Sequence, residues 1–173
     1  FRKSLPYEGS ARIPLILAGP RDAGLRRGAA LDPLVELRDV MPTLLDCAGL
    51  PAAEGVEGRS FLPFARGETP PWREFLHGEH TVGQPGGAVH WIVEGDEKYI
   101  WFSQTGREQL FDLRRDPGER HDLAPAPAAA GRLEILRRRL AAELAGREEG
   151  FSDGRRLIAG RPVSPCLATL SAG

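Results

Sequence analysis

The chain has 173 residues, of which 41% are hydrophobic and 27% are charged, as in an ordinary globular protein. Its net charge is −1 and its isoelectric point lies near 6.5, so charge gives no indication of nucleic acid or an anionic membrane as a partner. No apolar run approaches the roughly 20 residues that a membrane-spanning helix needs.

The predicted elements begin with the end of an α/β sheet. Residues 13–18 form a continuous apolar run followed by Gly-Pro, which is typical of a strand buried on both faces. Residues 34–37 predict a second short strand. A helix is predicted over 40–48, with Asp39 as its N-cap and Gly49 as the residue that ends it.

After a linker rich in Gly and Pro over 51–73, the pattern changes to the alternation of half-buried strands. The Gly-Asp pair at 95–96 is a hairpin-turn signal between two of these strands. We expect an antiparallel meander of three or four strands, at residues 75–80, 88–94, 98–102 and 108–113.

The longest predicted helix, about 128–146, carries one apolar stripe that we expect to pack on the meander. The stripe consists of Leu133, Leu136, Leu140 and Leu144. Three parts follow from these patterns: the end of an α/β core at 1–70, a sheet-plus-helix subdomain at 71–150, and an irregular tail at 151–173.

The two cysteines, Cys47 and Cys166, lie far apart and outside any CxxC pair. A cysteine zinc site is therefore not expected, and two unpaired thiols are favoured over a single disulfide.

The segment around His77, Glu79 and His80 holds candidate metal ligands. Residues three apart on a strand point to opposite faces, which argues against a metal shared by the two histidines. A rim or core position is favoured for them, with a place in a substrate pocket as the alternative for His80 or Glu79. We interpret His90 and His121 as structural or exposed.

Four segments have more specific patterns. Residues 3–14 read K-S-L-P-Y-E-G-S-A-R-I-P, and residues 35–46 read V-E-L-R-D-V-M-P-T-L-L-D. Residues 58–61 read G-R-S-F, and residues 109–119 read Q-L-F-D-L-R-R-D-P-G-E. Each pattern alone is of moderate specificity, whereas four in one order and spacing are a strong signal.

Together these segments resemble the sulfatase family of the alkaline-phosphatase-like superfamily, from Lys3 to about Ala124. One departure is Phe61, which stands where the family usually has Leu. The resemblance implies an α/β fold in which the first part completes the large catalytic domain. The rest would be a small C-terminal subdomain, an antiparallel sheet packed by a long helix, which is α+β in character.

The resemblance also implies a catalytic role for Lys3, whose counterpart contacts the sulfate. Negative charge develops on the sulfate oxygens in the transition state, and a positioned ammonium stabilises it. The alternative is a solvated surface lysine. Tyr7, Glu8 and Arg12 would hold the lysine loop in shape, with the Glu8 carboxylate accepting hydrogen bonds from Arg12 or from backbone amides.

The family's nucleophile is a formylglycine made within C/S-x-P-x-R, and neither cysteine of this chain lies in such a pattern. Only Phe1 and Arg2 precede Lys3, so the resemblance places the nucleophile and the Ca²⁺ ligands upstream, in a missing N-terminal catalytic region. We therefore expect no metal site in this chain and no activity from the chain alone.

The expected function is that of a sulfatase C-terminal part, in an enzyme that hydrolyses a small-molecule sulfate ester. A phosphonate monoester hydrolase or phosphodiesterase of the same superfamily is the enzymatic alternative. A non-catalytic binding module, left after loss of the nucleophile domain, is the alternative from another class.

Overall fold

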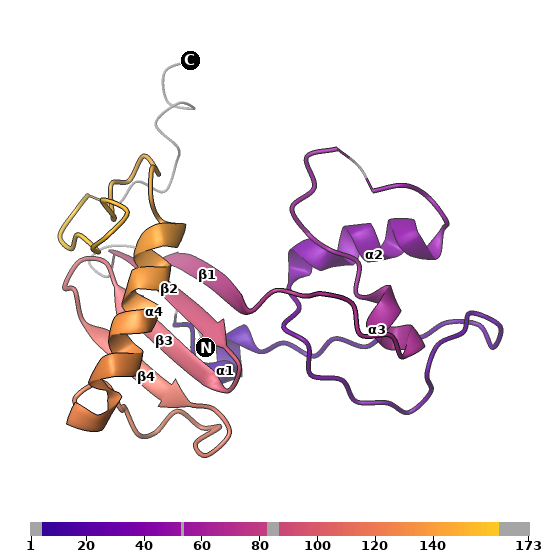
Figure 1. The fold of residues 1–173 in the computed structure, drawn as a ribbon, viewed down its shortest axis with the longest axis horizontal. Coiled ribbons are helices and arrows are strands. Elements are labelled where there is room, and N and C mark those ends of the chain that lie inside the picture. Colours follow the sequence, from indigo (N-terminus) through magenta and orange to yellow (C-terminus); the bar gives the residue numbers. More distant parts are fainter. Residues whose placement is uncertain (1–4, 53, 83–86, 163–173) are drawn as a thin grey trace. The chain divides into compact units, whose positions relative to one another are not determined.

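The computed structural model describes residues 5–52, 54–82 and 87–162 (Figure 1). They fall into two compact units, one formed by Pro14–Leu76 and the other by the described parts of Phe1–Ile13 and His77–Gly173. The division at residues 70 and 150 remains a prediction. What the structure adds is that the residues just after Lys3 belong to the same unit as the sheet.

The predicted antiparallel meander is confirmed as a four-stranded sheet in the order β1-β2-β3-β4. The strands are β1 Phe75–Val82, β2 Gly87–Glu94, β3 Glu97–Phe102 and β4 Glu108–Asp112. Glu94 pairs with Glu97, so the predicted Gly-Asp turn closes the β2–β3 hairpin. Gly95 has a φ of 57°, a conformation that a glycine adopts without steric cost.

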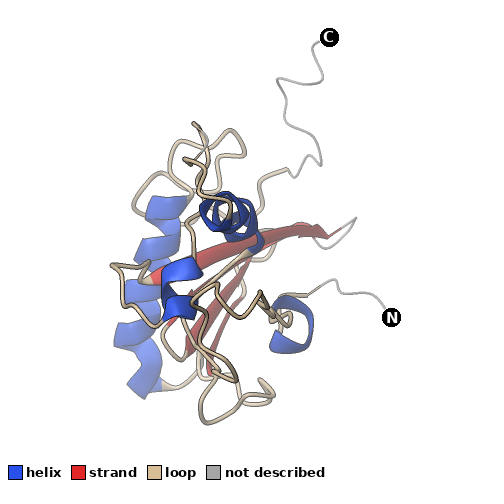
Figure 2. Cartoon of the chain, turned by 90° about the vertical axis from the view of Figure 1, so that its right-hand side faces the viewer, coloured by secondary structure: helices blue, strands red, loops and turns tan. Residues whose placement is uncertain are grey.

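The two faces of the sheet carry different partners, because side chains alternate along each strand. The long helix covers one face, and the short α1 turn (Glu8–Ala11) lies on the other (Figure 2). On the α1 face, Val89, Ile100 and Phe111 form a buried cluster against which Tyr7 packs.

The helix face is covered by α4 (Ala130–Glu143), which follows the 3₁₀ turn η2 (Pro127–Ala129). All four leucines of the predicted stripe are at most 8% exposed, which confirms the stripe as core. Arginines on the flanks of α4 pair with carboxylates of the strands, as in Arg137 Nη2 to Glu108 Oε2 at 2.7 Å. None of the described helices has the length and apolar character that crossing a bilayer requires.

The other unit contains η1 (Leu37–Asp39), α2 (Val40–Cys47) and α3 (Leu62–Arg66). The helix predicted over 40–48 is confirmed, and Gly49 follows it with a φ of 67°. The strands predicted at 13–18 and 34–37 are wrong, since neither segment forms one. A strand exists only where a neighbouring chain accepts and donates its backbone hydrogen bonds, and neither run has such a neighbour among the described residues.

Candidate functional site

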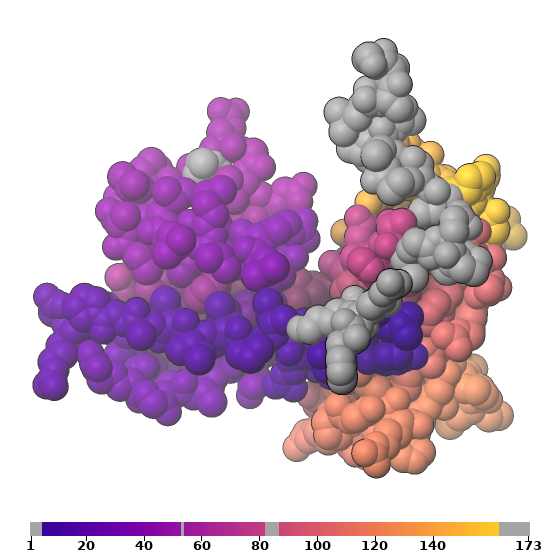
Figure 3. Space-filling model, turned by 180° about the vertical axis from the view of Figure 1, so that it is seen from behind, coloured from indigo at the N-terminus to yellow at the C-terminus, as the bar shows by residue number. Residues whose placement is uncertain are grey.

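The segment shortly after Lys3 is attached to the sheet. Its residues Tyr7 and Glu8 contact side chains of β3, of β4 and of the turn that follows β4. Tyr7 donates a hydrogen bond from its hydroxyl to Gln109 Oε1 at 2.9 Å, and its ring meets Phe111 edge-on at 6.0 Å between centroids. In the space-filling view, indigo residues near the start of the chain lie against the salmon-coloured residues of the sheet (Figure 3).

The centre of this attachment is Lys98, which is fully buried on β3. Its ammonium lies 2.8 Å from Glu8 Oε1 and 3.1 Å from Glu119 Oε1. The side chain of Glu119 is only 2% exposed, and its second oxygen accepts a hydrogen bond from the backbone N–H of Glu8. A buried ammonium needs such partners because desolvation without pairing costs several kcal/mol. These three residues are called the Lys98 anchor below.

The turn that carries Glu119 explains the D-P-x-E pattern of the sequence. Asp116 Oδ2 accepts hydrogen bonds from the backbone amides of Arg120 and His121, both at 2.7 Å. Glu119 itself has a φ of 52°, which is uncommon for a residue with a side chain. The turn therefore holds Glu119 in an unfavourable backbone conformation from which its carboxylate reaches Lys98 and Glu8.

The predicted site residues are only partly brought together. Lys3 lies outside the described residues. Tyr7 and Glu8 lie on the sheet as described, whereas Arg12 is exposed and its guanidinium is 3.8 Å from the Glu8 carboxylate. Glu8 is thus held mainly by Lys98, a partner that sequence reasoning missed.

A local signal for Lys98 was present in the sequence. Lys98 alternates with Ile100 and Phe102 along a strand whose other residues, apart from Glu97, are apolar or aromatic. A charged residue on the inward face of a strand requires a buried partner, and the alternation therefore identifies Lys98 as part of a polar site.

In the other unit, the D-V-x-P-T-L-L-D motif holds the G-R-S-F segment. Asp39, Thr43 and Asp46 are spaced so that they share one side of α2. Asp39 Oδ1 accepts from the amide of Arg59 at 2.8 Å, Thr43 Oγ1 accepts from the amide of Phe61 at 3.1 Å, and Asp46 Oδ2 accepts from the Ser60 hydroxyl at 2.5 Å. A Cβ at Gly58 would lie 1.9 Å from the carbonyl oxygen of Arg38, so glycine is required there.

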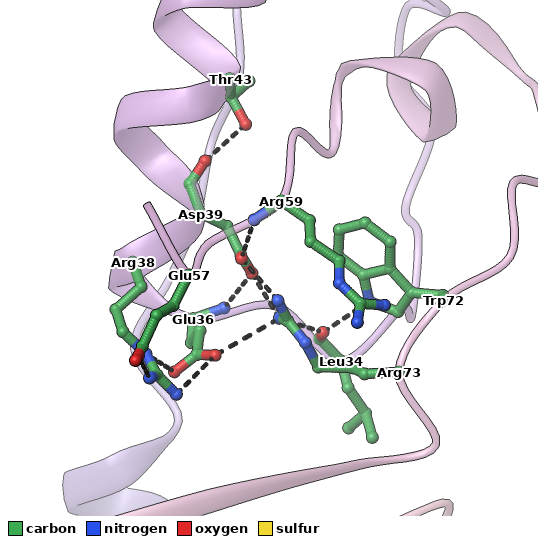
Figure 4. A network of polar contacts seen from close by, with 9 residues as sticks. All are labelled: Leu34, Glu36, Arg38, Asp39, Thr43, Glu57, Arg59, Trp72 and Arg73. Atoms are coloured by element: carbon green, nitrogen blue, oxygen red, sulfur yellow. Dashed lines mark hydrogen bonds and ion pairs between the residues drawn. The ribbon is translucent and has the colours of Figure 1, made fainter. Parts of the chain in front are cut away.

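Asp39 is the centre of the polar network drawn in Figure 4. Its carboxylate accepts from the guanidinium of Arg73 at 2.5 and 2.6 Å and from the amide of Glu36 at 2.9 Å. Burial acts to raise the pKa of Asp39, but these hydrogen bonds together outweigh it and lower that pKa below its usual value. Asp39 is the N-cap residue of α2, as predicted, but its side chain makes no capping hydrogen bond to that helix, because both oxygens are taken by these partners.

The histidine segment on β1 divides between the two faces of the sheet. His77 and Glu79 lie with His90 of β2, and their ligand atoms are within 4.8 Å of one another, whereas His80 is not in this group. The prediction that residues 77 and 80 point to opposite faces agrees with this grouping. Glu79 and His80 both line a small pocket, and their predicted contact with substrate remains a prediction.

The remaining candidates are the histidines at 90 and 121 and the two cysteines. The side chain of His121 is 81% exposed, as expected, and His90 is buried. Cys47 is an exposed free thiol, and Cys166 lies outside the described residues.

Comparisons with known proteins agree with the motifs. A family model described as N-sulphoglucosamine sulphohydrolase, C-terminal, matches residues 1–146. An arylsulfatase of Clostridium perfringens (strain 13 / Type A) is 44% identical over 165 residues, which are 95% of this chain and 34% of that protein.

Solved structures share the fold. A 2-O GAG sulfatase has a TM-score of 0.58 at 23% identity, over 73% of this chain and 30% of that one. A phosphonate monoester hydrolase from Silicibacter pomeroyi has a TM-score of 0.60 at 25% identity, over 80% of this chain and 32% of that one.

The helix-packed antiparallel sheet and the four motifs of the chain define the C-terminal part of a sulfatase-type hydrolase. This chain belongs to the sulfatase family. It spans 34% of the length of the Clostridium arylsulfatase that it matches.

Proposed function

We propose that the full-length protein hydrolyses sulfate esters and that this chain supplies a lysine to the sulfate. The observation that carries the proposal is the Lys98 anchor, which attaches the segment next to Lys3 to the sheet through Glu8. Lys3 lies five positions before Glu8, which is at most about 18 Å of extended chain. An anchor so close restricts where the Lys3 ammonium can reach, which is the positioning that transition-state stabilisation needs.

The proposal includes a catalytic core upstream that packs on the unit formed by Pro14–Leu76. In support, that unit exposes large apolar side chains, including Ile16 at 87%, Leu37 at 71% and Leu44 at 61%. Exposed apolar side chains gathered in one small unit are typical of a surface that is covered in the complete molecule.

Calcium and formylglycine are assigned to that upstream core. Among the described residues, the one group of potential ligands close enough to share an ion contains two imidazoles and one carboxylate. Calcium prefers six to eight oxygen ligands, so this group does not fit it.

Replacing Lys3 by alanine in the full-length protein is expected to lower kcat for 4-nitrophenyl sulfate roughly 100- to 1,000-fold, the usual effect of removing one group that stabilises transition-state charge. Arg2→Ala is the matched control, since it removes a cation from the adjacent position. Release of 4-nitrophenol measures both variants. Equal activity of Lys3→Ala and wild type would contradict the role of Lys3.

The second candidate function, phosphonate monoester hydrolysis, is favoured by the TM-score of 0.60 to a hydrolase of that kind. The ratio of kcat/KM for 4-nitrophenyl sulfate to that for 4-nitrophenyl phenylphosphonate separates the two. We expect a ratio above one, because the relative with 44% identity is an arylsulfatase. A ratio well below one would favour the second candidate.

A further inference from the structure

On the face of the sheet that α4 covers, His77, Glu79 and His90 lie close enough together to be ligands of one metal ion. His77 Nε2 lies 3.3 Å from His90 Nδ1, and Glu79 Oε2 lies 3.5 Å from the same His90 nitrogen and 4.0 Å from His77 Nε2. Residues 77 and 79 are two apart on β1 and therefore share a face. His90 joins them from β2, the neighbouring strand.

These separations suit a common ion. Two ligands at the Zn–N distance of 2.0–2.1 Å and at a tetrahedral angle are about 3.3–3.4 Å apart. The His77–His90 and His90–Glu79 separations fall within about 0.2 Å of that value, and the third is longer by about 0.6 Å.

The surroundings of His77 resemble the support that metal-bound histidines usually have. Its other ring nitrogen, Nδ1, lies 3.9 Å from Glu143 Oε1 on α4. Ligand histidines usually donate a hydrogen bond from this second nitrogen to a carboxylate. At 3.9 Å Glu143 lies within ion-pair range of His77, which is longer than a hydrogen bond. Both imidazoles are well buried, at 9% and 3% exposure of the side chain, whereas Glu79 is 45% exposed and leaves the site open to solvent.

Arg147 would compete with a metal ion for the Glu79 carboxylate. Its guanidinium donates to both oxygens of Glu79, at 2.7 and 2.9 Å. A carboxylate has about four lone-pair positions, so each oxygen can accept from Arg147 and keep a position for another partner. Arg147 also holds Glu79 beside the two imidazoles, which fixes the third ligand before any ion arrives.

We propose that His77, Glu79 and His90 form a binding site for a first-row transition metal ion of the zinc type. Two imidazoles and one carboxylate with an open position suit Zn²⁺ and related ions better than Ca²⁺ or Mg²⁺, which take oxygen ligands. The site lies on the α4 face of the sheet, whereas the Lys98 anchor lies on the opposite face. It is therefore separate from the Lys98 anchor.

The test is a calorimetric titration of Zn²⁺ into the full-length protein after treatment with a chelator. We expect one binding event that disappears in the His77→Ala, His90→Gln double variant. Glu143→Gln is expected to weaken the same event by less than the roughly 10- to 100-fold that the loss of a hydrogen-bonded partner of a ligand histidine usually costs. Circular dichroism confirms that each variant has the wild-type fold.

His80→Ala and His121→Ala are the matched controls, because each removes a histidine outside the group. Both should leave the event unchanged. The proposal is overturned if the double variant binds Zn²⁺ with wild-type stoichiometry and affinity, which would mean an adventitious ion elsewhere. It is also overturned if wild type shows no such event, in which case His77 and His90 form only a hydrogen-bonded pair.

Discussion

Replacing Lys98 by methionine is expected to lower the free energy of unfolding by about 3–5 kcal/mol, the usual cost of removing one partner from a buried ion pair. The change leaves two carboxylates, those of Glu8 and Glu119, beside each other without their cation. The side chain of Glu119 is almost fully buried, so water cannot replace the lost ammonium. Urea unfolding followed by tryptophan fluorescence measures the loss, because Trp91 and Trp101 lie in the sheet.

The control for this prediction is the triple variant Lys98→Met, Glu8→Gln, Glu119→Gln. It removes the cation and both anions together, and replacing a whole buried ionic group by neutral groups is often nearly neutral. It should recover most of the stability lost in Lys98→Met. A loss below about 1 kcal/mol for Lys98→Met alone would show that the pair behaves like one at the surface.

Replacing Asp39 by asparagine is expected to cost a similar amount, about 3–5 kcal/mol, in the unit that contains α2. Asp39 is fully buried, and the side chain of Arg73 is 11% exposed. Without the Asp39 carboxylate, the guanidinium of Arg73 loses its two short contacts and keeps the more distant carboxylate of Glu36, whose Oε1 lies 3.7 Å from Nη1. The fluorescence of Trp72, which donates to the carbonyl of Leu34 in this network, reports on the unfolding of this unit.

The Asp39 prediction has a pH dependence with a definite sign. Its pKa is lower in the folded chain than in the unfolded chain, where it is about 3.9. The stabilisation is therefore present above about pH 3.9 and is lost as the pH falls through the lower, folded pKa. The difference in urea midpoint between wild type and Asp39→Asn should shrink in acid. A difference that stays constant from neutral to strongly acid pH would contradict the account.

Glu57→Gln is the matched control for the Asp39 variant, since Glu57 is exposed and pairs with Arg38 at the edge of the same network.

Elements whose partners lie within the chain could be predicted from the sequence. The strands from β1 to β4 follow one another through short connections, so alternation and a turn signal predict both the strands and their pairing. The apolar run at 13–18 has the same kind of side chains, but it forms no strand. A sequence pattern reports which side chains favour burial, whereas a strand also requires a hydrogen-bonding neighbour.

The site was less accessible to sequence reasoning for a related reason. Glu8 and Lys98 are separated by 90 positions, and Glu8 and Glu119 by 111. The motifs containing Glu8 and Glu119 could be recognised, but no local pattern shows that they meet on one lysine. The grouping of His77 with His90 likewise depends on which strand lies beside β1, and alternation along β1 alone cannot give it.

The central claim is that the Lys98 anchor acts on catalysis by positioning Lys3. The measurement that tests it is kcat/KM for 4-nitrophenyl sulfate in the full-length wild type, Lys3→Ala, Lys98→Met and the double variant, below the unfolding temperature of each. If Lys98 acts through Lys3, each single change lowers kcat/KM, and Lys98→Met costs little more once Lys3 is gone. Losses that add fully in the double variant would contradict the claim, because the two lysines would then act independently.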